Sequence, residues 1–293
     1  MPSIAGYLAG EFPPEKKSFK LYGEVTGTLL ECHARAYQSI HKKAPAAPGG
    51  TRPQAGIAQA YQWIEPWGSE GLAGLAEKAA AHAFRHGSFK AWDDSVVTGR
   101  AQFPFGSREI PGLQNSYDFC GVNYYFRMSL KCDPARPDRG FMDMETMPEG
   151  IEKTEMGWQI YPPGFHNILM QTWTRFRKPI YITENGIADA ADAVRPRYLL
   201  WHLRQLHRAI RDGADIRGYF HWSFMDNFEW KEGFCKQFGL VAVDHDDPEL
   251  ARRPRRSAEL FSAIIAENAI TEDMVREYAP DAMDGVFGDQ WME

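Results

Sequence analysis

The sequence predicts an α/β protein of the TIM (β/α)8-barrel type, of which this chain provides about four parallel strands. Strand-like runs alternate with helical periods along the chain, which is typical of βαβ units and a parallel sheet. Polar side chains follow several of these runs, at the strand ends where parallel barrels collect catalytic groups. A complete barrel has eight strands and typically ~250 residues before insertions. The strong strand patterns number half of that, so we expect the C-terminal half of a barrel.

The composition is that of a soluble globular protein and excludes several classes of function. Hydrophobic residues make up 44% and charged residues 25% of the 293 residues, enough for one large domain over 1–293. The net charge of −6 gives no broad basic surface for nucleic acid. No apolar run is long enough to cross a membrane, and the first residues lack the regions of a signal peptide.

The 4 cysteines indicate a reducing environment. Cys32, Cys120, Cys132 and Cys235 match neither a zinc-ligand spacing nor a small disulfide framework. Cys120 lies in an apolar run and is expected to be a buried thiol. Free thiols favour a cytoplasmic protein, and we expect no metal and no other cofactor.

The first half of the chain contains two of the four strand patterns. Helices are indicated by apolar residues every three or four positions or by alanine-rich composition. Strands are indicated by alternation and by aromatic or β-branched runs. The expected elements are a loop at Gly6–Pro14, a helix at Phe19–Lys42, a loop at Ala44–Pro53, a strand at Gln54–Trp63, helices at Gly71–Arg85 and Phe89–Val97, a loop at Gly99–Gly106, and a strand at Tyr117–Tyr125.

The second half repeats the alternation after a long polar excursion. The same patterns predict three helices and two strands there. Beyond Asn268 no period is clear, so 269–293 is expected to be an acidic C-terminal tail. The expected elements are an irregular stretch at Lys131–Lys153, a helix at Phe165–Arg175, a strand at Ile180–Ile182, a helix at Arg195–Arg211, a strand at Tyr219–Trp222, and a helix at Arg256–Glu267.

A first candidate catalytic residue lies in the stretch Pro-Ile-Tyr-Ile-Thr-Glu-Asn-Gly at 179–186. The β-branched and aromatic run is typical of a buried strand. The dipeptide Asn185-Gly186 is a turn signal that ends it, so Glu184 lies at or just beyond the strand's C-terminal end. Taken alone, a glutamate before a turn is common, and an ordinary exposed glutamate remains an open interpretation.

A second stretch, Gly218–Trp230, adds the groups that a sugar site requires. A strand pattern runs there into a loop that carries Asp226, Asn227, Glu229 and Trp230. Pyranose rings have apolar faces that stack on tryptophan, and hydroxyl edges that need carboxylate and amide partners. The two stretches together favour a carbohydrate site over an isolated surface glutamate.

At this point the chain resembles a known family. Ile-Thr-Glu-Asn-Gly followed by Trp-Ser-Phe-Met-Asp-Asn-Phe-Glu-Trp is similar to glycoside hydrolase family 1, the β-glucosidase family of retaining enzymes. Further segments follow in the family's order from Gly6 to about Ser257, so the resemblance is to the family's C-terminal portion. It implies hydrolysis of a β-glucoside or oligosaccharide by double displacement, without a cofactor.

The resemblance also implies roles for six residues. In a retaining enzyme a second carboxylic acid, ~5–5.5 Å from the nucleophile, first protonates the leaving oxygen and then acts as base. The implied roles are the nucleophile for Glu184, its hydrogen-bonding tyrosine for Tyr125, a neighbouring amide for Asn123, sugar-stacking tryptophans for Trp222 and Trp230, and the carboxylate that holds the distal hydroxyls for Glu229.

One departure from the family pattern concerns that second carboxylic acid. The family carries it in an Asn-Glu-Pro motif after the fourth strand, and this sequence has no Asn-Glu pair and begins about where that motif would end. A smaller departure is Gln237, where the family usually has arginine.

Three interpretations of this departure stay open. The missing half comes from another polypeptide, a second copy or an N-terminal segment; another carboxylate, Glu65 or Glu11, supplies the acid; or the chain is a truncated sugar-binding or structural protein. An open half-sheet would leave strand edges and apolar surface uncovered, so we expect self-association or a complementary half-barrel chain.

Overall fold

The fold is built on a sheet of four parallel strands. The structure is a computed structural model that describes residues 3–46, 48–103, 106–136, 141–144 and 150–289. The strand order is β1-β4-β6-β7, and each neighbouring pair is parallel. The strands are β1 (Gly56–Pro66), β4 (Phe119–Cys132), β6 (Ile180–Asn185) and β7 (Ile216–His221). This parallel core with its helices confirms the predicted partial (β/α)8 barrel.

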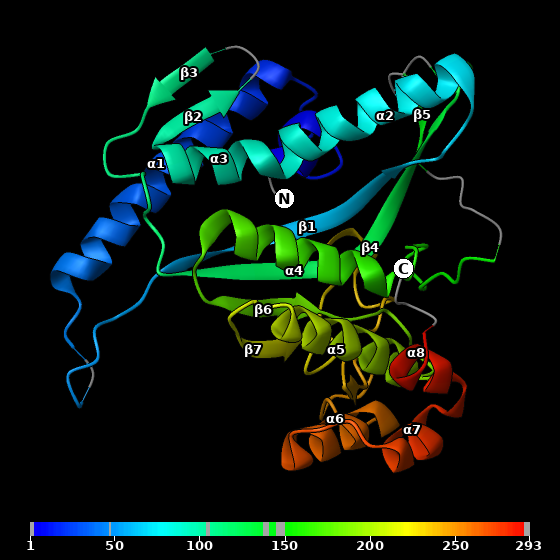
Figure 1. The fold of residues 1–293 in the computed structure, drawn as a ribbon. Coiled ribbons are helices and arrows are strands. Elements are labelled where there is room, and N and C mark those ends of the chain that lie inside the picture. The colour runs from blue at the N-terminus through cyan, green and yellow to red at the C-terminus, as the bar shows by residue number, and fades with distance from the viewer. Residues whose placement is uncertain (1–2, 47, 104–105, 137–140, 145–149, 290–293) are drawn as a thin grey trace.

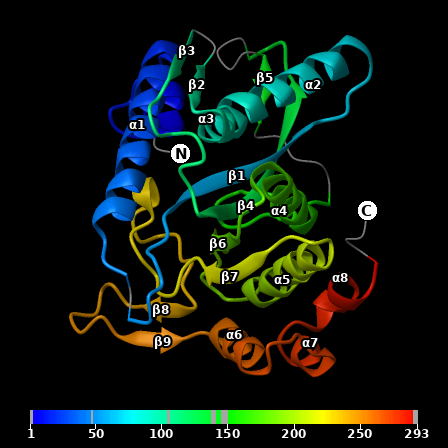
Figure 2. The ribbon, with the colours of Figure 1, turned by 60° about the vertical axis from the view of Figure 1, so that its left-hand side comes forward.

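Helices follow the strands in the alternation that the sequence predicts. Figure 1 shows α4 and α5 side by side over the sheet, and Figure 2 shows α6 and α7 beyond them at the C-terminal end of the chain. The helices are α1 (Phe19–Lys43), α2 (Gly71–Arg85), α3 (Ala91–Thr98), α4 (Pro162–Phe176), α5 (Arg195–Arg211), α6 (Arg256–Glu267), α7 (Glu272–Tyr278) and α8 (Met283–Phe287).

Several shorter elements lie around the parallel sheet and its helices. Two small antiparallel pairs and a two-residue strand that extends β4 lie outside the parallel sheet. Helical single turns connect several of the larger elements. The short elements are β2 (Arg100–Phe103) with β3 (Gly106–Glu109), β8 (Val241–Val243) with β9 (Arg252–Pro254), β5 (Met142–Asp143), and the turns at Ile4–Ala9, His86–Lys90, Trp230–Glu232 and Pro280–Ala282.

Local sequence sets the helix ends. Ser18 begins α1, since its hydroxyl accepts a hydrogen bond from the N–H of Leu21 at 3.3 Å. Thr271 caps α7 in the same way. Prolines occupy the first turn of α4 and of α5, where their missing N–H costs nothing. The expected bounds of α1, α2, α5 and α6 agree with the structure within a residue, and for α1 and α5 these signals mark the first turn.

Irregularities in the sheet lie near the carboxyl ends of its strands. Tyr61 of β1 pairs with Tyr124 of β4, but Trp63 pairs with Arg127, so β4 holds one extra residue between them. A bulge of this kind re-aims the side chains beside it. A second irregularity lies where β4 meets β6, next to the pairing of Asn123 with Glu184. Because pairing resumes beyond the bulge, β1 and β4 run past their expected ends.

One face of the sheet is packed under helices. Val122, Ile180 and Ile182 are fully buried there in a hydrophobic core with residues of α4 such as Phe165 and Leu169. Side chains alternate along a strand, so Asn123 and Tyr125 point to the opposite face. The sheet therefore separates a hydrophobic face from a face that carries the candidate site residues.

Three expectations need correction in detail. The Gly/Pro-rich segment expected as a loop contains a helical turn at Ile4–Ala9. The loop expected at Gly99–Gly106 belongs largely to the β2–β3 hairpin, whose strands have only four residues each and are too short for a clear sequence pattern. The irregular stretch expected at Lys131–Lys153 begins with the last two residues of β4, and β5 pairs with them. Residues 137–140 and 145–149 of this stretch lie outside the described residues.

The expected acidic tail is folded up to residue 289. Helices α7 and α8 bury Val275, Ala279, Ala282 and Val286 in a second hydrophobic core with residues of α5. Each helix is too short to show a clear sequence period. This segment therefore covers α5 rather than extending away from the domain.

Candidate active site

The strongest contact at the predicted site joins β4 to β6. Glu184 is the next-to-last residue of β6, and its Oε2 accepts a hydrogen bond of 2.6 Å from the hydroxyl of Tyr125. The side chain of Asn123 also hydrogen-bonds Glu184. Thr183 donates to the Asn123 Oδ1 at 2.5 Å. Three of the six predicted residues are thus brought together at the carboxyl ends of adjacent strands.

The electrostatics of this pair keep a neutral donor beside a carboxyl group. Burial raises the pKa of Glu184, while its hydrogen bonds from Tyr125 and Asn123 act in the opposite direction. Burial and the nearby charge of Glu184 raise the pKa of Tyr125 well above its usual value. The tyrosine therefore stays protonated and donates, and this donation favours the ionised form of Glu184.

The loop after β7 brings Trp222 next to the end of β6. The backbone N–H of Trp222 donates to the carbonyl oxygen of Asn185 at 3.0 Å. A Cβ on Gly186 would lie 1.7 Å from the Trp222 carbonyl oxygen, so only glycine allows this approach. The two sequence stretches that predict the site therefore meet through backbone contacts as well.

Glu229 is the second buried carboxyl group of the site. It is 8% exposed and accepts a hydrogen bond from the side chain of Trp222. Burial, followed by the charge of Glu184, raises the pKa of Glu229. Its Oε2 has no hydrogen-bond partner among the described residues. A buried carboxylate oxygen without a partner is costly, and a ligand hydroxyl would satisfy it.

Trp230 lies at the solvent side of this group. It is 65% exposed and stacks on Phe12, with ring centroids 5.6 Å apart and planes inclined by 29°. Phe12 cannot be predicted as a site residue from the sequence, because nothing in the Gly/Pro-rich segment indicates its distant partner. The contact brings the N-terminal segment, including the exposed Glu11, toward the loop that carries Trp230.

An ion pair absent from the predicted set fixes this loop. The Asp226 carboxylate accepts hydrogen bonds from the backbone N–H groups of Gly239 and Val243. It also accepts one from each terminal nitrogen of Arg255, both at 3.0 Å. Arg255 also donates to the Gln237 amide oxygen at 2.7 Å. Gln237, in place of the arginine that the family pattern favours, thus accepts from an arginine 18 residues further along the chain.

Glu65, a candidate for the missing acid, is engaged elsewhere. Its Oε1 accepts from the Trp63 indole N–H at 2.5 Å, and its Oε2 lies 3.3 Å from a terminal nitrogen of Arg127. Trp63 lies against α4, since a Cβ on Gly164 would come within 2.7 Å of the Trp63 Cβ. Glu65 therefore points to the helix-covered face, away from Tyr125, and is an ion-pair partner there.

Other features limit what the site can hold. Among the described residues, no group of three or more His, Cys, Asp or Glu side chains could bind a metal ion. All four cysteines are free thiols, with Cys120 buried as expected. Within the same described ranges, no helix has the length and apolar character that crossing a membrane would require.

A half-barrel of parallel strands that ends in a carboxyl group hydrogen-bonded by a tyrosine has the architecture of barrel-type glycoside hydrolases. The family model described as glycosyl hydrolase family 1 matches residues 1–270. The chain belongs to glycosyl hydrolase family 1.

Relatives with known names agree with this assignment. A beta-galactosidase of Saccharolobus solfataricus is 34% identical over 290 residues, which cover 93% of this chain and 55% of that protein. A 1,4-beta-D-glucan glucohydrolase of Thermotoga neapolitana is 37% identical over 293 residues, which cover 92% of this chain and 62% of that protein.

A solved structure shows the same relationship. The beta-glycosidase from Pyrococcus horikoshii superposes with a TM-score of 0.80 at 35% identity, over 94% of this chain and 61% of that one. The chain therefore spans a little more than half the length of these relatives.

Proposed function

We propose that this chain carries the nucleophile-bearing half of a retaining β-glycosidase site that acts on β-glucosides or related oligosaccharides. The observation that carries the proposal is the hydrogen bond between Tyr125 and Glu184 at the end of β6. In the first step a Glu184 oxygen forms a bond to the anomeric carbon while the glycosidic C–O bond breaks and the leaving oxygen takes a proton. In the second step water displaces Glu184 from the same carbon and loses a proton.

The neighbouring groups suit the sugar ring of such a substrate. The Trp222 side chain hydrogen-bonds Glu229, whose buried Oε2 has no partner among the described residues, and its indole offers an apolar face. Asn123 lies on the other side of Glu184 in the adjacent strand. We assign these residues and the exposed Trp230 to binding of the glycone.

The proposal needs a second carboxylic acid to protonate the leaving oxygen. Glu65 is held by Trp63 and Arg127 on the helix-covered face, which argues against that role. We propose that the acid belongs to the remaining strands of a complete barrel, whether in a longer chain, a second copy or a complementary chain. The four free thiols support a cytoplasmic location.

Covalent trapping tests the assignment of Glu184. A 2-deoxy-2-fluoro glucoside with a dinitrophenolate leaving group needs no acid for the first step, so the chain should gain one glycosyl unit. Peptide mass spectrometry should place the unit on Glu184, and Glu184→Gln should not react. Label on another residue with Glu184 unmodified would refute the assignment.

The second candidate function is a sugar-binding protein without catalysis. The open oxygen of Glu229 favours it as much as it favours an enzyme, because a ligand hydroxyl satisfies it in either case. Saturable binding of glucose without any covalent label on Glu184 would select this function.

A further inference from the structure

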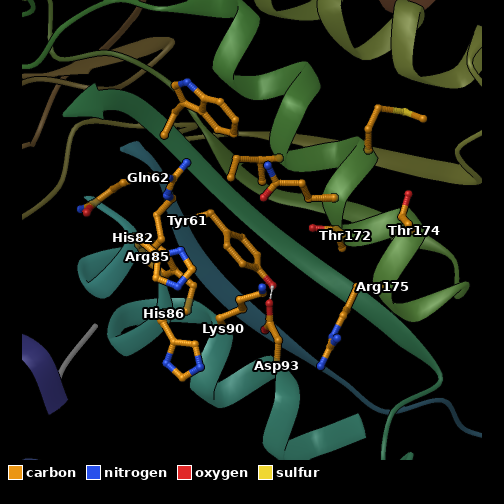
Figure 3. Close-up of a pocket in the computed structure, with 15 residues that line it drawn as sticks. Tyr61, Gln62, His82, Arg85, His86, Lys90, Asp93, Thr172, Thr174 and Arg175 are labelled. Carbon is orange, nitrogen blue, oxygen red and sulfur yellow. Dashed lines mark hydrogen bonds between the residues drawn. The ribbon is translucent and has the colours of Figure 1, made fainter. Parts of the chain in front are cut away.

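A cavity of about 650 Å³ lies on the helix-covered side of β1, away from Glu184. Its walls come from β1, from α2 and α3 with the turn between them, and from α4 (Figure 3). The volume is that of a site for a small organic molecule, not of a gap for a few waters. Aromatic and apolar walls are provided by Trp63, Phe89, Ile168 and Met170.

The charge of the lining is opposite to that of the chain. Acidic residues outnumber Lys and Arg by 39 to 33 in the whole sequence. The lining holds three residues with a fixed positive charge and two histidines, against one acid, Asp93. Such a local excess of positive charge attracts and orients an anionic ligand. The basic residues are His82 and Arg85 of α2, His86 and Lys90 of the following turn, and Arg175 of α4.

Two of these cations are free to bind. Arg85 donates through Nε to the Ala81 carbonyl oxygen at 3.2 Å, and its two terminal nitrogens have no partner among the described residues. The Lys90 side chain has no hydrogen bond or ion pair within the described ranges. Arg175, by contrast, is paired with Asp94. Arg85 and Lys90 therefore offer donors that no described side chain occupies.

The acid in the cavity, Asp93, is half-buried and hydrogen-bonded by a tyrosine. The Tyr61 hydroxyl hydrogen-bonds both oxygens of Asp93, at 3.1 and 3.2 Å (Figure 3). Burial raises the pKa of Asp93 to about 7, while Tyr61 and Arg175 act against that rise. Near neutral pH the negative charge of Asp93 is therefore partly removed, and the positive side chains dominate the cavity.

We infer that this cavity binds a phosphorylated sugar, with the phosphate between Arg85 and Lys90. A phosphate takes several charge-assisted hydrogen bonds from guanidinium and ammonium groups. The rest of the cavity exceeds the size of a phosphate and offers what a sugar needs: the indole of Trp63 for a ring face, and polar groups for its hydroxyls. Those polar groups are Gln62, Gln171, Thr172 and Thr174. The inference does not depend on the proposed glycosidase activity.

Calorimetric titration of the purified chain with glucose 6-phosphate, inorganic phosphate and glucose tests the proposal. Glucose 6-phosphate should bind with a Kd below about 1 mM, and both inorganic phosphate and glucose at least ~10-fold more weakly. Equal affinity for inorganic phosphate would show that the sugar makes no contribution and overturn the assignment. No binding of glucose 6-phosphate, or equal binding of glucose, would also overturn it.

Variants locate the binding. Arg85→Gln and Lys90→Gln should each weaken binding of glucose 6-phosphate ~10-fold or more, since each removes a charge-assisted contact. Lys78→Gln, which removes an exposed lysine of the same helix outside the cavity, should change the Kd less than ~2-fold. Trp222→Ala should leave this binding intact and thereby separate it from the candidate active site. Normal affinity in a folded Lys90→Gln variant would contradict the proposal.

Discussion

The hydroxyl of Tyr125 lies 2.6 Å from Oε2 of Glu184 and ties the ends of β4 and β6 together. Burial opposes the ionised form of Glu184, and this hydrogen bond favours it. The pKa of this carboxyl group therefore depends on a residue 59 positions away in the chain. A pH profile can measure that dependence.

Replacing Tyr125 by phenylalanine should slow trapping of Glu184 by the 2-fluoro glucoside ~10-fold or more, because a hydrogen bond to a charged group is lost. The pKa of Glu184 should rise further, so the acid limb of the labelling rate should move to higher pH. Mass spectrometry over a pH series gives both values. Tyr117→Phe, at the other end of the same run, is the control. An unmoved acid limb would show that the contact does not govern the carboxylate.

The sequence predicts the parallel core because each strand is a local run of β-branched or aromatic residues, as in Ile180–Ile182. It does not predict where β1 and β4 end, since their pairing resumes beyond a bulge between Tyr61 and Trp63. It also misses the β2–β3 hairpin and helix α7, whose short segments show no period. The sequence does not predict these features because they depend on pairing and packing between segments that lie far apart in the chain.

The same distinction applies to the site residues. Glu184 and Glu229 lie within long motifs and can be named from the chain. Arg255 cannot, because its contact with Asp226 spans 29 residues and arises only when β8 and β9 pair. The cavity beside Arg85 is missed for the same reason, since its walls come from α2, β1 and α4.

Glu229→Gln should separate stability from binding. The buried Oε2 has no partner in the described part of the chain, and the pKa of this carboxyl group is raised. Removing its charge should therefore change the free energy of unfolding by less than about 1 kcal/mol. Sugar binding should weaken by about 1.5–3 kcal/mol, as for a hydrogen bond to a charged group. Urea unfolding and the concentration dependence of trapping measure the two effects. A large loss of stability would show that Glu229 is structural.

Two buried histidines should make the fold sensitive to acid. Burial lowers the pKa of His202 and of His221 to about 3, against ~6.5 for an unfolded chain. Between these values the unfolded state binds more protons, so the free energy of unfolding should fall as pH falls from ~6.5 toward 3. Each histidine contributes about 1.4 kcal/mol per pH unit.

A comparison of variants on α5 and β7 tests this origin. Urea unfolding of His221→Gln between pH 6.5 and 4 should show a shallower fall in the free energy of unfolding than the parent chain. His207→Gln, which changes an exposed histidine of α5, should keep the parent slope. Identical slopes in all three proteins would mean that other groups govern the acid response.

The uncovered side of the half-barrel should cause self-association. Phe220 of β7 and Phe224 beyond it are 59% and 68% exposed, while Tyr219 and His221 pack into the core side. Light scattering should show a molecular mass that rises with concentration, and Phe220→Lys with Phe224→Lys should reduce it. Leu72→Lys, at an even more exposed apolar residue of α2, is the control. A monomer at every concentration would contradict this expectation.

If the isolated chain turns over substrate, it should strongly prefer activated glycosides. A nitrophenolate leaves without a proton, whereas a sugar alkoxide does not, and general acid catalysis is worth typically ~10²–10⁴-fold. Glu65 is held by Arg127, so unless Glu11 supplies the acid, Glu184 acts without that assistance. Nitrophenyl glucoside should therefore react with Glu184, and cellobiose should react at least ~10²-fold more slowly.

The second step should then limit turnover, because no base activates the water that must release the sugar from Glu184. Nitrophenol should appear as a burst equal to the number of active chains, followed by slow turnover. Azide attacks the glycosyl-enzyme without a base, so it should raise the steady rate and yield glucosyl azide of unchanged anomeric configuration. Rate measurements on both substrates, each with and without azide, check this. Fast cellobiose hydrolysis without an azide response would show that a carboxylic acid assists Glu184. The variant Glu11→Gln would then test the candidate that remains open.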